Sequence, residues 1–364
     1  MADSALITTL DEFQSEYRKG IGTVLPYRPA KQASVDNLRR YADGVGDYNP
    51  LFRSPEYAVT SRYEDLVASP TFLYAITLGV IAGETGAIDR ARVNTQYLPV
   101  NYAGAEIDFI RPIWRDDTIT AMETVGETTR KTSSRIGDIN FNTGHVLFTN
   151  QRQEVVATIK TLMARYQNTG GTLEYARESK DAQVRQVIAP DPLVFERTRQ
   201  GGDKRFWEDV QEGDQLDPLQ KGTYSVTELF LFTHGVLGTG RSTRSALAAE
   251  GSTDLGGGGR FDEEHAQKRR NMPGQFDYGP QRVCWLAQAA TDWMGDYGTL
   301  KKLHASIRHP NVVGDTNTVY GTVSKKYETD EGALLVEVSI ENRNQAGLAT
   351  AYATATIELP SKTA

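Results

Sequence analysis

Two stretches of this chain carry matching residues in the same order, and this internal repeat is the feature that most constrains the fold. The first, S-V-D-N-L-R-R-Y-A-D-G-V-G-D-Y-N-P-L-F, spans Ser34 to Phe52, and the second, S-V-T-E-L-F-L-F-T-H-G-V-L-G-T-G, spans Ser225 to Gly240. Such a repeat predicts two similar structural units in tandem. Asp47 of the first stretch aligns with Gly238 of the second. We therefore expect the two units to differ in chemistry.

The repeat continues along the chain. Gly44 aligns with Gly235, and P-E-Y-A resembles E-E-H-A downstream. Each unit then has an apolar stretch that opens near a Pro, which predicts a long helix buried on nearly all sides. An I-R element ending in Asp-Thr follows, and then alternating segments typical of strands, with Asn-Gln in the turn between the last two. The paired segments are Ser69–Gly86 and Tyr278–Gly295, Ile110–Thr118 and Ile307–Thr316, and Gly144–Tyr166 and Ala333–Leu359.

This order of elements predicts an α+β fold of the tandem, or double, hotdog type. In each half a long buried helix is wrapped by an antiparallel sheet, and the two sheets join edge to edge, which removes an exposed edge. The 364 residues are enough for two domains of about 150 residues each. We expect an N-terminal hotdog at 1–166, a crossover at 167–204 with a helix from about Leu173 to Val187, and a C-terminal hotdog at 205–364.

Composition excludes several classes of function. The net charge is −7, whereas a nucleic-acid-binding protein usually presents a basic face. No apolar run is long enough for a membrane helix, and the N-terminus has no secretion signal, so we expect a cytoplasmic protein. The single cysteine, Cys284, lies in an apolar stretch and is expected to be a core residue. No metal-ligand spacing is present, so we expect no metal site.

The first repeat stretch resembles a known motif. Y-A-D-G-V-G-D-Y-N-P-L-F is similar to the hydratase motif of the MaoC-like family, which includes (R)-specific enoyl-CoA hydratases and 3-hydroxyacyl dehydratases. That motif reads roughly G-D-x-N-P-x-H, and Gly46, Asp47, Asn49 and Pro50 match it. A-S-P-T-F and I-R-P…D-D-T resemble the FAS1-like dehydratase halves at the N-terminus of double-hotdog members. Y-G-P-Q-R, W-M-G-D-Y-G and R-H-P-N-V-V-G-D-T are similar to C-terminal halves of the same kind of protein.

The resemblance implies a reaction in which an Asp and a His hold one water that adds to an enoyl thioester. Addition requires both removal and delivery of a proton. Asp47 is the expected acid-base group and Asn49 its support, but Phe52 stands at the His position. His234 and Tyr278, with Asp277 beside the latter, are the candidates for the missing partner. An alternative role for Asp47 is to cap the turn that follows it.

The same chemistry requires groups that stabilise an enolate and bind the thioester. The N-terminus of each predicted long helix supplies a backbone N–H and a favourable dipole, near Thr71 and near Gly279. The substrate would be the only cofactor-like group, and the phosphates of CoA would need cations. Candidate cations cluster in the second half around a Gly-rich loop that is either a surface loop or a flap over the acyl chain. They are Arg241, Arg244, Arg260, Lys268, Arg269 and Arg270.

Three functions remain open from the sequence. The first is hydration of an enoyl thioester, or dehydration of a 3-hydroxyacyl thioester, on CoA or an acyl carrier. The second is a non-catalytic hotdog subunit that binds acyl chains and supports an active partner, because Phe52 cannot transfer a proton. The third is thioester hydrolysis using Glu84, although I-A-G-E-T-G indicates a helix end at that residue. We expect a homodimer or a heteromer with another hotdog protein.

Overall fold

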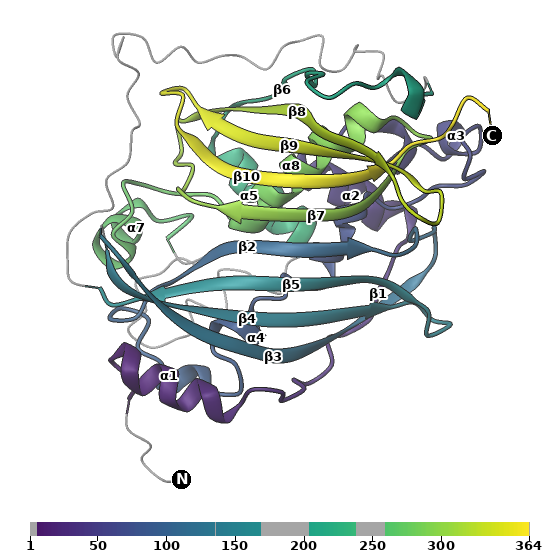
Figure 1. Cartoon of the computed structure of the whole chain (residues 1–364). Helices are drawn as coiled ribbons and strands as arrows, with labels where there is room; N and C mark the ends of the chain where they lie inside the picture. Colours follow the sequence, from purple (N-terminus) through teal and green to yellow (C-terminus); the bar gives the residue numbers. More distant parts are fainter. Residues whose placement is uncertain (1–5, 135, 169–203, 238–258, 364) are drawn as a thin grey trace.

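The computed structural model describes residues 6–134, 136–168, 204–237 and 259–363. Within these ranges the strands form one antiparallel sheet in the order β1-β3-β4-β5-β2-β7-β10-β9-β8-β6 (Figure 1). The strands are β1 (Lys31–Gln32), β2 (Val100–Phe109), β3 (Thr118–Ser133), β4 (Gly137–Thr149), β5 (Val155–Tyr166), β6 (Leu219–Thr223), β7 (Thr299–Ile307), β8 (Thr316–Glu328), β9 (Leu334–Asn344) and β10 (Ala349–Glu358). The α+β double-hotdog prediction, with its joined sheets, is therefore confirmed.

Helices lie against one face of this sheet, with α2, α5 and α8 behind its C-terminal half in the view of Figure 1. The helices are α1 (Leu10–Lys19), α2 (Val35–Val45), α3 (Pro55–Ala58), α4 (Ile81–Glu84), α5 (Val226–Phe232), α7 (Glu263–Arg270) and α8 (Gly279–Met294), with 3₁₀ turns η1 (Pro50–Phe52), η2 (Pro70–Ala75), η3 (Arg90–Arg92) and η6 (Trp207–Asp209), and the π-helix η7 (Thr233–Leu237). None of these helices has the length and hydropathy needed to cross a membrane. The helix expected near 173–187 lies outside the described residues, and the domain boundaries stay a prediction.

The two halves meet where β2 pairs with β7. Ala105 lies opposite Ala305, and this pairing runs from Gly104–Ser306 to Asp108–Lys302. The close approach explains the glycine, since a Cβ on Gly104 would lie 2.3 Å from the Ala305 carbonyl oxygen. The sheet therefore has its edges at β1 and β6, which are equivalent strands of the two halves.

Matching hydrogen bonds establish the repeat in three dimensions. In the first half, Gln151 Nε2 donates to Asp117 at 2.8 Å, and Gln151 Oε1 accepts from the N–H of the residue after that Asp at 2.9 Å. In the second half, Gln345 makes the same two bonds around Asp315, both at 3.0 Å. The Asp-Thr and Asn-Gln elements of the sequence are thus one structural device used twice.

The repeated helices also contact each other directly. Ser34 and Ser225 each cap a helix, since their side chains accept from backbone N–H groups of α2 and α5. The chains then meet at the two aligned glycines. A Cβ on Gly235 would lie 2.7 Å from Gly44 Cα and 2.5 Å from the Arg40 carbonyl oxygen. The repeat therefore identified the point of closest approach between the halves.

The prediction of one long buried helix in each half is correct for the second half and wrong for the first. In the second half α8 is buried along almost its whole length. The first half has only η2 and α4, separated by a bend. At the bend Thr77 Oγ1 accepts from the Gly79 N–H at 3.0 Å and donates to Glu123 at 2.6 Å. Gly79 has φ +62°, and these side-chain bonds compete with those of a helix.

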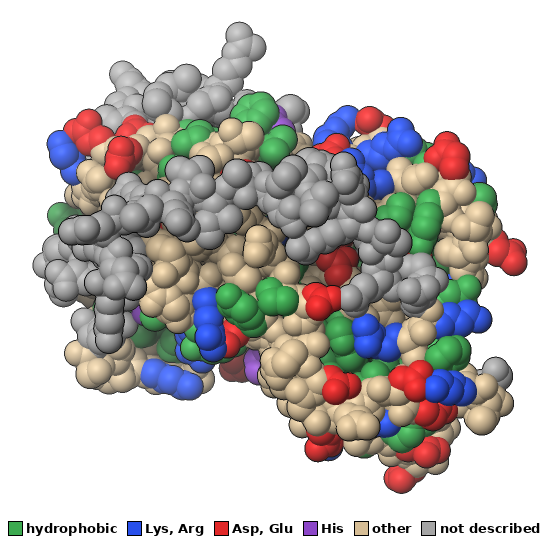
Figure 2. Space-filling view, turned by 90° about the horizontal axis from the view of Figure 1, so that it is seen from above, with side chains coloured by type: hydrophobic (Ala, Val, Ile, Leu, Met, Phe, Trp, Pro, Cys, Tyr) green, Lys and Arg blue, Asp and Glu red, His purple; other side chains and the backbone are tan. Residues whose placement is uncertain are grey.

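The surface carries charges of both signs. On the face shown in Figure 2, Lys and Arg side chains lie among Asp and Glu side chains, so the described part of that face has no continuous basic patch. This distribution agrees with the net charge of −7 and offers no support for nucleic-acid binding.

Candidate active site

The motif residues form a tight loop at the end of α2. Gly46 closes the helix in the left-handed conformation, with φ 67° and ψ 43°. Asp47 Oδ1 then accepts from the Asn49 N–H at 3.0 Å, and Asn49 Oδ1 accepts from the Leu51 N–H at 2.9 Å. Asp47 is 1% exposed and Asn49 is 2% exposed. The capping role considered for Asp47 is therefore present in the structure.

The second half holds this loop in place through Lys221. A register irregularity in β6 falls at Lys221, and such bulges redirect a side chain. Its Nζ donates to the carbonyl oxygens of Val45 and Gly46, at 3.1 and 2.9 Å, and to Gln288 Oε1 at 2.9 Å. Trp285 Nε1 also donates to the Val45 carbonyl, at 3.2 Å. The loop is thus built jointly by both halves.

Burial shifts the pKa values of the titratable groups around Asp47. It lowers the pKa of Lys221 to about 8, against an opposing effect of the Asp47 charge. It raises the pKa of Cys284 to about 12, with a smaller increase from Asp47. Burial likewise raises the pKa of Tyr41, with Asp47 again adding to the effect. Cys284 is therefore a buried, protonated thiol, as expected of a core residue.

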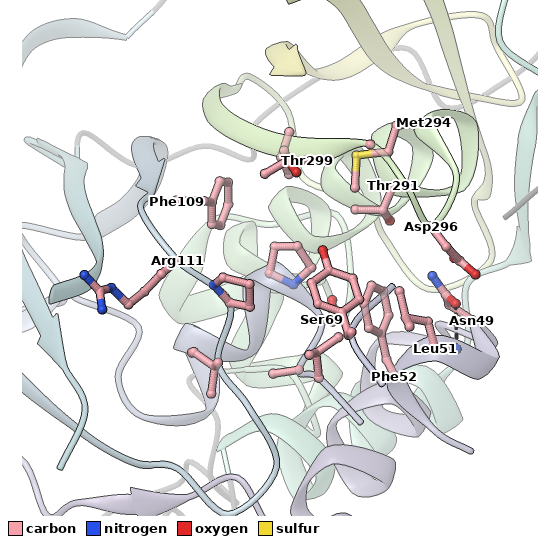
Figure 3. A pocket seen from close by; sticks show the side chains of 18 of the residues that line it. Asn49, Leu51, Phe52, Ser69, Phe109, Arg111, Thr291, Met294, Asp296 and Thr299 are labelled. Carbon is pink, nitrogen blue, oxygen red and sulfur yellow. Dashed lines mark hydrogen bonds between the residues drawn. The ribbon is translucent and has the colours of Figure 1, made fainter. Parts of the chain in front are cut away.

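A cavity of about 100 Å³ lies beside the motif loop (Figure 3). Its wall is mostly apolar and combines both halves. Asn49 and Phe52 line it, so the residue at the motif's His position does face this space, whereas Asp47 is not among the lining residues. The remaining wall comes from parts of Val67–Leu73, Phe109–Ile113, Val156–Ala157 and Thr291–Leu300, together with Leu51 and Tyr63.

Polar groups at this cavity include several that the sequence did not single out. Asp296 lines it directly after α8, is 4% exposed and accepts from the Tyr57 hydroxyl at 2.6 Å. Arg111 lines it as well and pairs with Glu154 at 2.6 Å. Exposed Arg62 donates to Gly298 and Thr299 of the wall, both at 2.8 Å. The sequence signal for Asp296 was the Gly-Asp pair that ends the long helix, in W-M-G-D-Y-G.

The predicted partners of Asp47 lie elsewhere. The His234 ring is 4.1 Å from the Phe230 ring. The Tyr278 hydroxyl accepts from Thr233 at 3.3 Å, and its ring stacks on Phe232. Neither residue lines the cavity. Asp277 is buried in an ion pair with Arg282, at 2.7 Å, and burial raises its pKa to about 6.

The predicted enolate-stabilising positions are also outside the cavity wall. Thr71 Oγ1 accepts from the Tyr41 hydroxyl at 2.8 Å, although Ser69 and Pro70 just before it do line the wall. Gly279 packs on Tyr102, where an added Cβ would lie 2.8 Å from the Tyr102 Cβ. The Thr71 N–H begins a 3₁₀ turn rather than an α-helix, so its dipole is weaker than the one we expected.

Those of the expected phosphate-binding cations that the structure describes do not line the cavity. Arg260 stacks 3.9 Å over the Tyr278 ring, and Arg270 donates to the Val100 carbonyl at 3.1 Å. Arg241, Arg244 and the Arg269 side chain lie outside the described residues. Exposed Lys268 pairs with Glu264 within α7. Glu84 ends α4, as the sequence indicated, and pairs with Arg90 at 3.1 Å.

Comparisons with known proteins agree with this architecture. A model of the FAS1-like dehydratase domain region matches residues 28–159. A UPF0336 protein of Saccharopolyspora erythraea is 30% identical over 146 residues, which are 40% of this chain and 88% of the relative. A solved MaoC-like dehydratase superimposes with a TM-score of 0.67 at 17% identity, covering 95% of this chain and all of the other. The chain belongs to the MaoC-like hotdog dehydratase family.

Two further similar proteins extend the comparison. A protein of Thermomonospora curvata named "Probable enoyl-CoA hydratase alpha subunit" is 24% identical over 211 residues, which are 54% of this chain and 61% of that protein. A Mycobacterium tuberculosis protein described as having a double hotdog fold superimposes with a TM-score of 0.57 at 11% identity, covering 94% of this chain and 97% of the other. At these identities the structural likeness supports the fold alone.

Among the described residues, no three His, Cys, Asp or Glu side chains group as metal ligands.

Proposed function

We propose that this protein is a hydratase or dehydratase that acts on an enoyl or 3-hydroxyacyl thioester. The observation that carries the proposal is the apolar cavity next to the motif loop, walled by both halves. An apolar cavity with a few polar groups suits an acyl chain with a polar reacting end. The family to which the chain belongs supplies the reaction class.

In this proposal Asp47 is the motif carboxylate that polarises the water. Asn49, which binds Asp47 through its N–H and also lines the cavity, connects the carboxylate to the reaction space. The charge of Asp47 acts to raise the pKa of both Lys221 and Cys284, which belong to the second half. The water would therefore be held at the end of the cavity nearest Asn49.

The thioester head group is proposed to leave the cavity past exposed arginines. Arg62 contacts two wall residues through its guanidinium, and Arg111 forms part of the wall. Guanidinium groups bind phosphates through paired hydrogen bonds. Within the described part of the chain these two residues are the proposed contacts of a CoA or acyl-carrier phosphate, and no further cofactor is proposed.

A second candidate function is a non-catalytic acyl-binding subunit that supports an active hotdog partner. Two observations favour it. Phe52 lies in the cavity wall at the position where the family motif has His, and Asp47 Oδ1 is engaged by the Asn49 N–H. One relative is itself named as an alpha subunit. The protein would then bind the thioester without converting it.

Turnover by the purified chain separates these two functions. We would follow the loss of enoyl absorbance with crotonyl-CoA and with a longer enoyl-CoA. The expected result is hydration that falls at least about 100-fold in Asp47→Ala, because the carboxylate that polarises the water is lost. Asp43→Ala, on the exposed side of the same helix end, is the matched control and should keep its activity. Inactivity of the wild-type chain alone, with activity restored by a co-purifying hotdog protein, would establish the second function instead.

A further inference from the structure

The cavity contains a carboxylate to which neither the repeat nor the motif assigned a role. Among the described residues that line the cavity, Asp296 is the sole Asp or Glu, and none is a His. Figure 3 shows Asp296 drawn at the same end of the cavity as Asn49 and Leu51, with Phe52 close to them. The group thus reaches the reaction space from the second half, whereas Asp47 belongs to the first.

The backbone places this carboxylate at the cavity. Gly295 ends α8 with φ +70° and ψ −177°, a conformation that only glycine adopts readily. The chain turns sharply there, and Asp296 leaves the direction of the helix at once. Without this turn at Gly295, the backbone of residue 296 would continue along the axis of α8. The Gly-Asp pair is therefore a local device that directs an acid towards the cavity.

A tyrosine from the other half orients the same carboxylate. The Tyr57 hydroxyl of α3 donates to Asp296 Oδ2 at 2.6 Å across 239 residues of sequence. Asp296 is only 4% exposed, so this bond forms in a largely water-excluded setting, where hydrogen bonds to charged groups are strong. A carboxylate that is oriented by a hydrogen bond and borders a cavity is arranged as general acid-base groups are.

We propose that Asp296 is the acid-base partner that takes the place of the histidine absent at Phe52. This inference rests on the proposed hydratase function and assigns its second group. As the water oxygen bonds to Cβ of the enoyl thioester, the Asp296 carboxylate takes one proton from that water, and the π electrons move to form the enolate. The Asp296 carboxylic acid then returns the proton to Cα. One water has been added, and the carboxylate is regenerated.

Asp296→Asn in the full chain tests the assignment, with crotonyl-CoA as the substrate. We expect kcat to fall at least about 100-fold, with KM changed less than about threefold. Binding of butyryl-CoA, which cannot be hydrated, should stay within about threefold by calorimetry. Asp292→Asn, an Asp on the last turn of α8 that does not line the cavity, is the matched control and should behave as the wild type.

Two more variants separate catalysis from a structural role. Tyr57→Phe removes the orienting bond and should lower kcat about tenfold, with KM changed less than about threefold, because the carboxylate remains. Asp296→Glu should recover part of the activity lost in Asp296→Asn. Activity of Asp296→Asn within threefold of wild type would overturn this inference alone. A wild-type chain inactive with every enoyl-CoA would overturn the proposed function, and this inference with it.

Discussion

Equivalent positions in the two halves are filled in opposite ways. In the first half the Ala68 N–H donates to the Ile113 carbonyl at 2.9 Å, and both residues line the cavity. In the second half the Asp277 N–H donates to the Asn311 carbonyl at 3.0 Å. The backbone geometry is the same, whereas two apolar side chains have become a carboxylate and an amide.

The contrast extends to the residue five positions further along. In the first half this is Leu73, which lines the cavity. In the second half it is Arg282, which pairs with Asp277 at 2.7 Å and donates to the carbonyl oxygens of His309 and Thr350. One half thus leaves an apolar space, while the other fills the equivalent place with a buried ion pair. The two halves therefore share a backbone arrangement and differ in the side chains that fill it.

Replacing Arg282 by the first-half residue should have the largest effect on stability. Arg282→Leu leaves Asp277 buried without its cation and removes the donor to two carbonyl groups. We expect the free energy of unfolding to fall by about 3–5 kcal/mol, as for other broken buried pairs. Urea denaturation followed by circular dichroism would measure it.

The matched control copies both first-half residues. Asp277→Ala with Arg282→Leu removes both charges and reproduces the Ala68 and Leu73 pair. Since a buried pair can often be replaced by apolar residues at little cost, this double variant should recover most of the stability lost in the single one. A double variant no more stable than Arg282→Leu would show that the ion pair does not account for the difference between the halves.

The contact between the halves at their aligned glycines should give the next largest effect. In Gly235→Ala the new Cβ would meet backbone atoms of Gly44 and Arg40 at 2.7 and 2.5 Å, which cannot rotate away. We expect a loss of about 1–3 kcal/mol, as for overpacked sites, measured by thermal unfolding. Thr227→Ala on the exposed side of α5 should have little effect, and equal stability of the two variants would contradict the close approach.

The repeat allowed much of this architecture to be predicted from sequence. Asp-Thr and Asn-Gln recur in each half because the two elements bond to each other. The Asp117–Gln151 bond of the first half has an equivalent in the Asp315–Gln345 bond of the second. Gly44 and Gly235 align because the two backbones approach so closely there that neither position has room for a Cβ. Structural features that both copies share can be predicted from sequence, since a pattern in one copy is supported by the same pattern in the other.

Features found in one copy depend on distant contacts and were missed. The apolar stretch of the first half bends where Thr77 bonds Glu123, a residue of a strand far along the chain. The local apolar pattern therefore predicted a long helix that does not form. Asp296 depends on Tyr57 and on the backbone of Gly295. The family motif drew attention to Asp47, whereas the cavity wall at the same loop is formed by Asn49 and Phe52.

Lys221 provides the smallest expected effect and probes the same asymmetry at the sheet edge. Its first-half equivalent is exposed Ala30, whereas Lys221 is drawn into the Asp47 loop. Because burial lowers the pKa of Lys221 to about 8, the folded chain releases this proton at lower pH than the unfolded chain does. Between the two pKa values the unfolded state binds more protons, so the contribution of Lys221 to stability rises with pH.

Lys221→Met removes this dependence while keeping the length of the side chain. We expect the difference in unfolding free energy between wild type and variant to shift in favour of the wild type, by on the order of 1 kcal/mol from about pH 7 to pH 9.5. Urea titrations at several pH values would measure it, with Ala30→Met as the control in the other half. A difference that stays constant over this range would mean that Lys221 is not desolvated, and that the second half does not clamp the Asp47 loop through a buried cation.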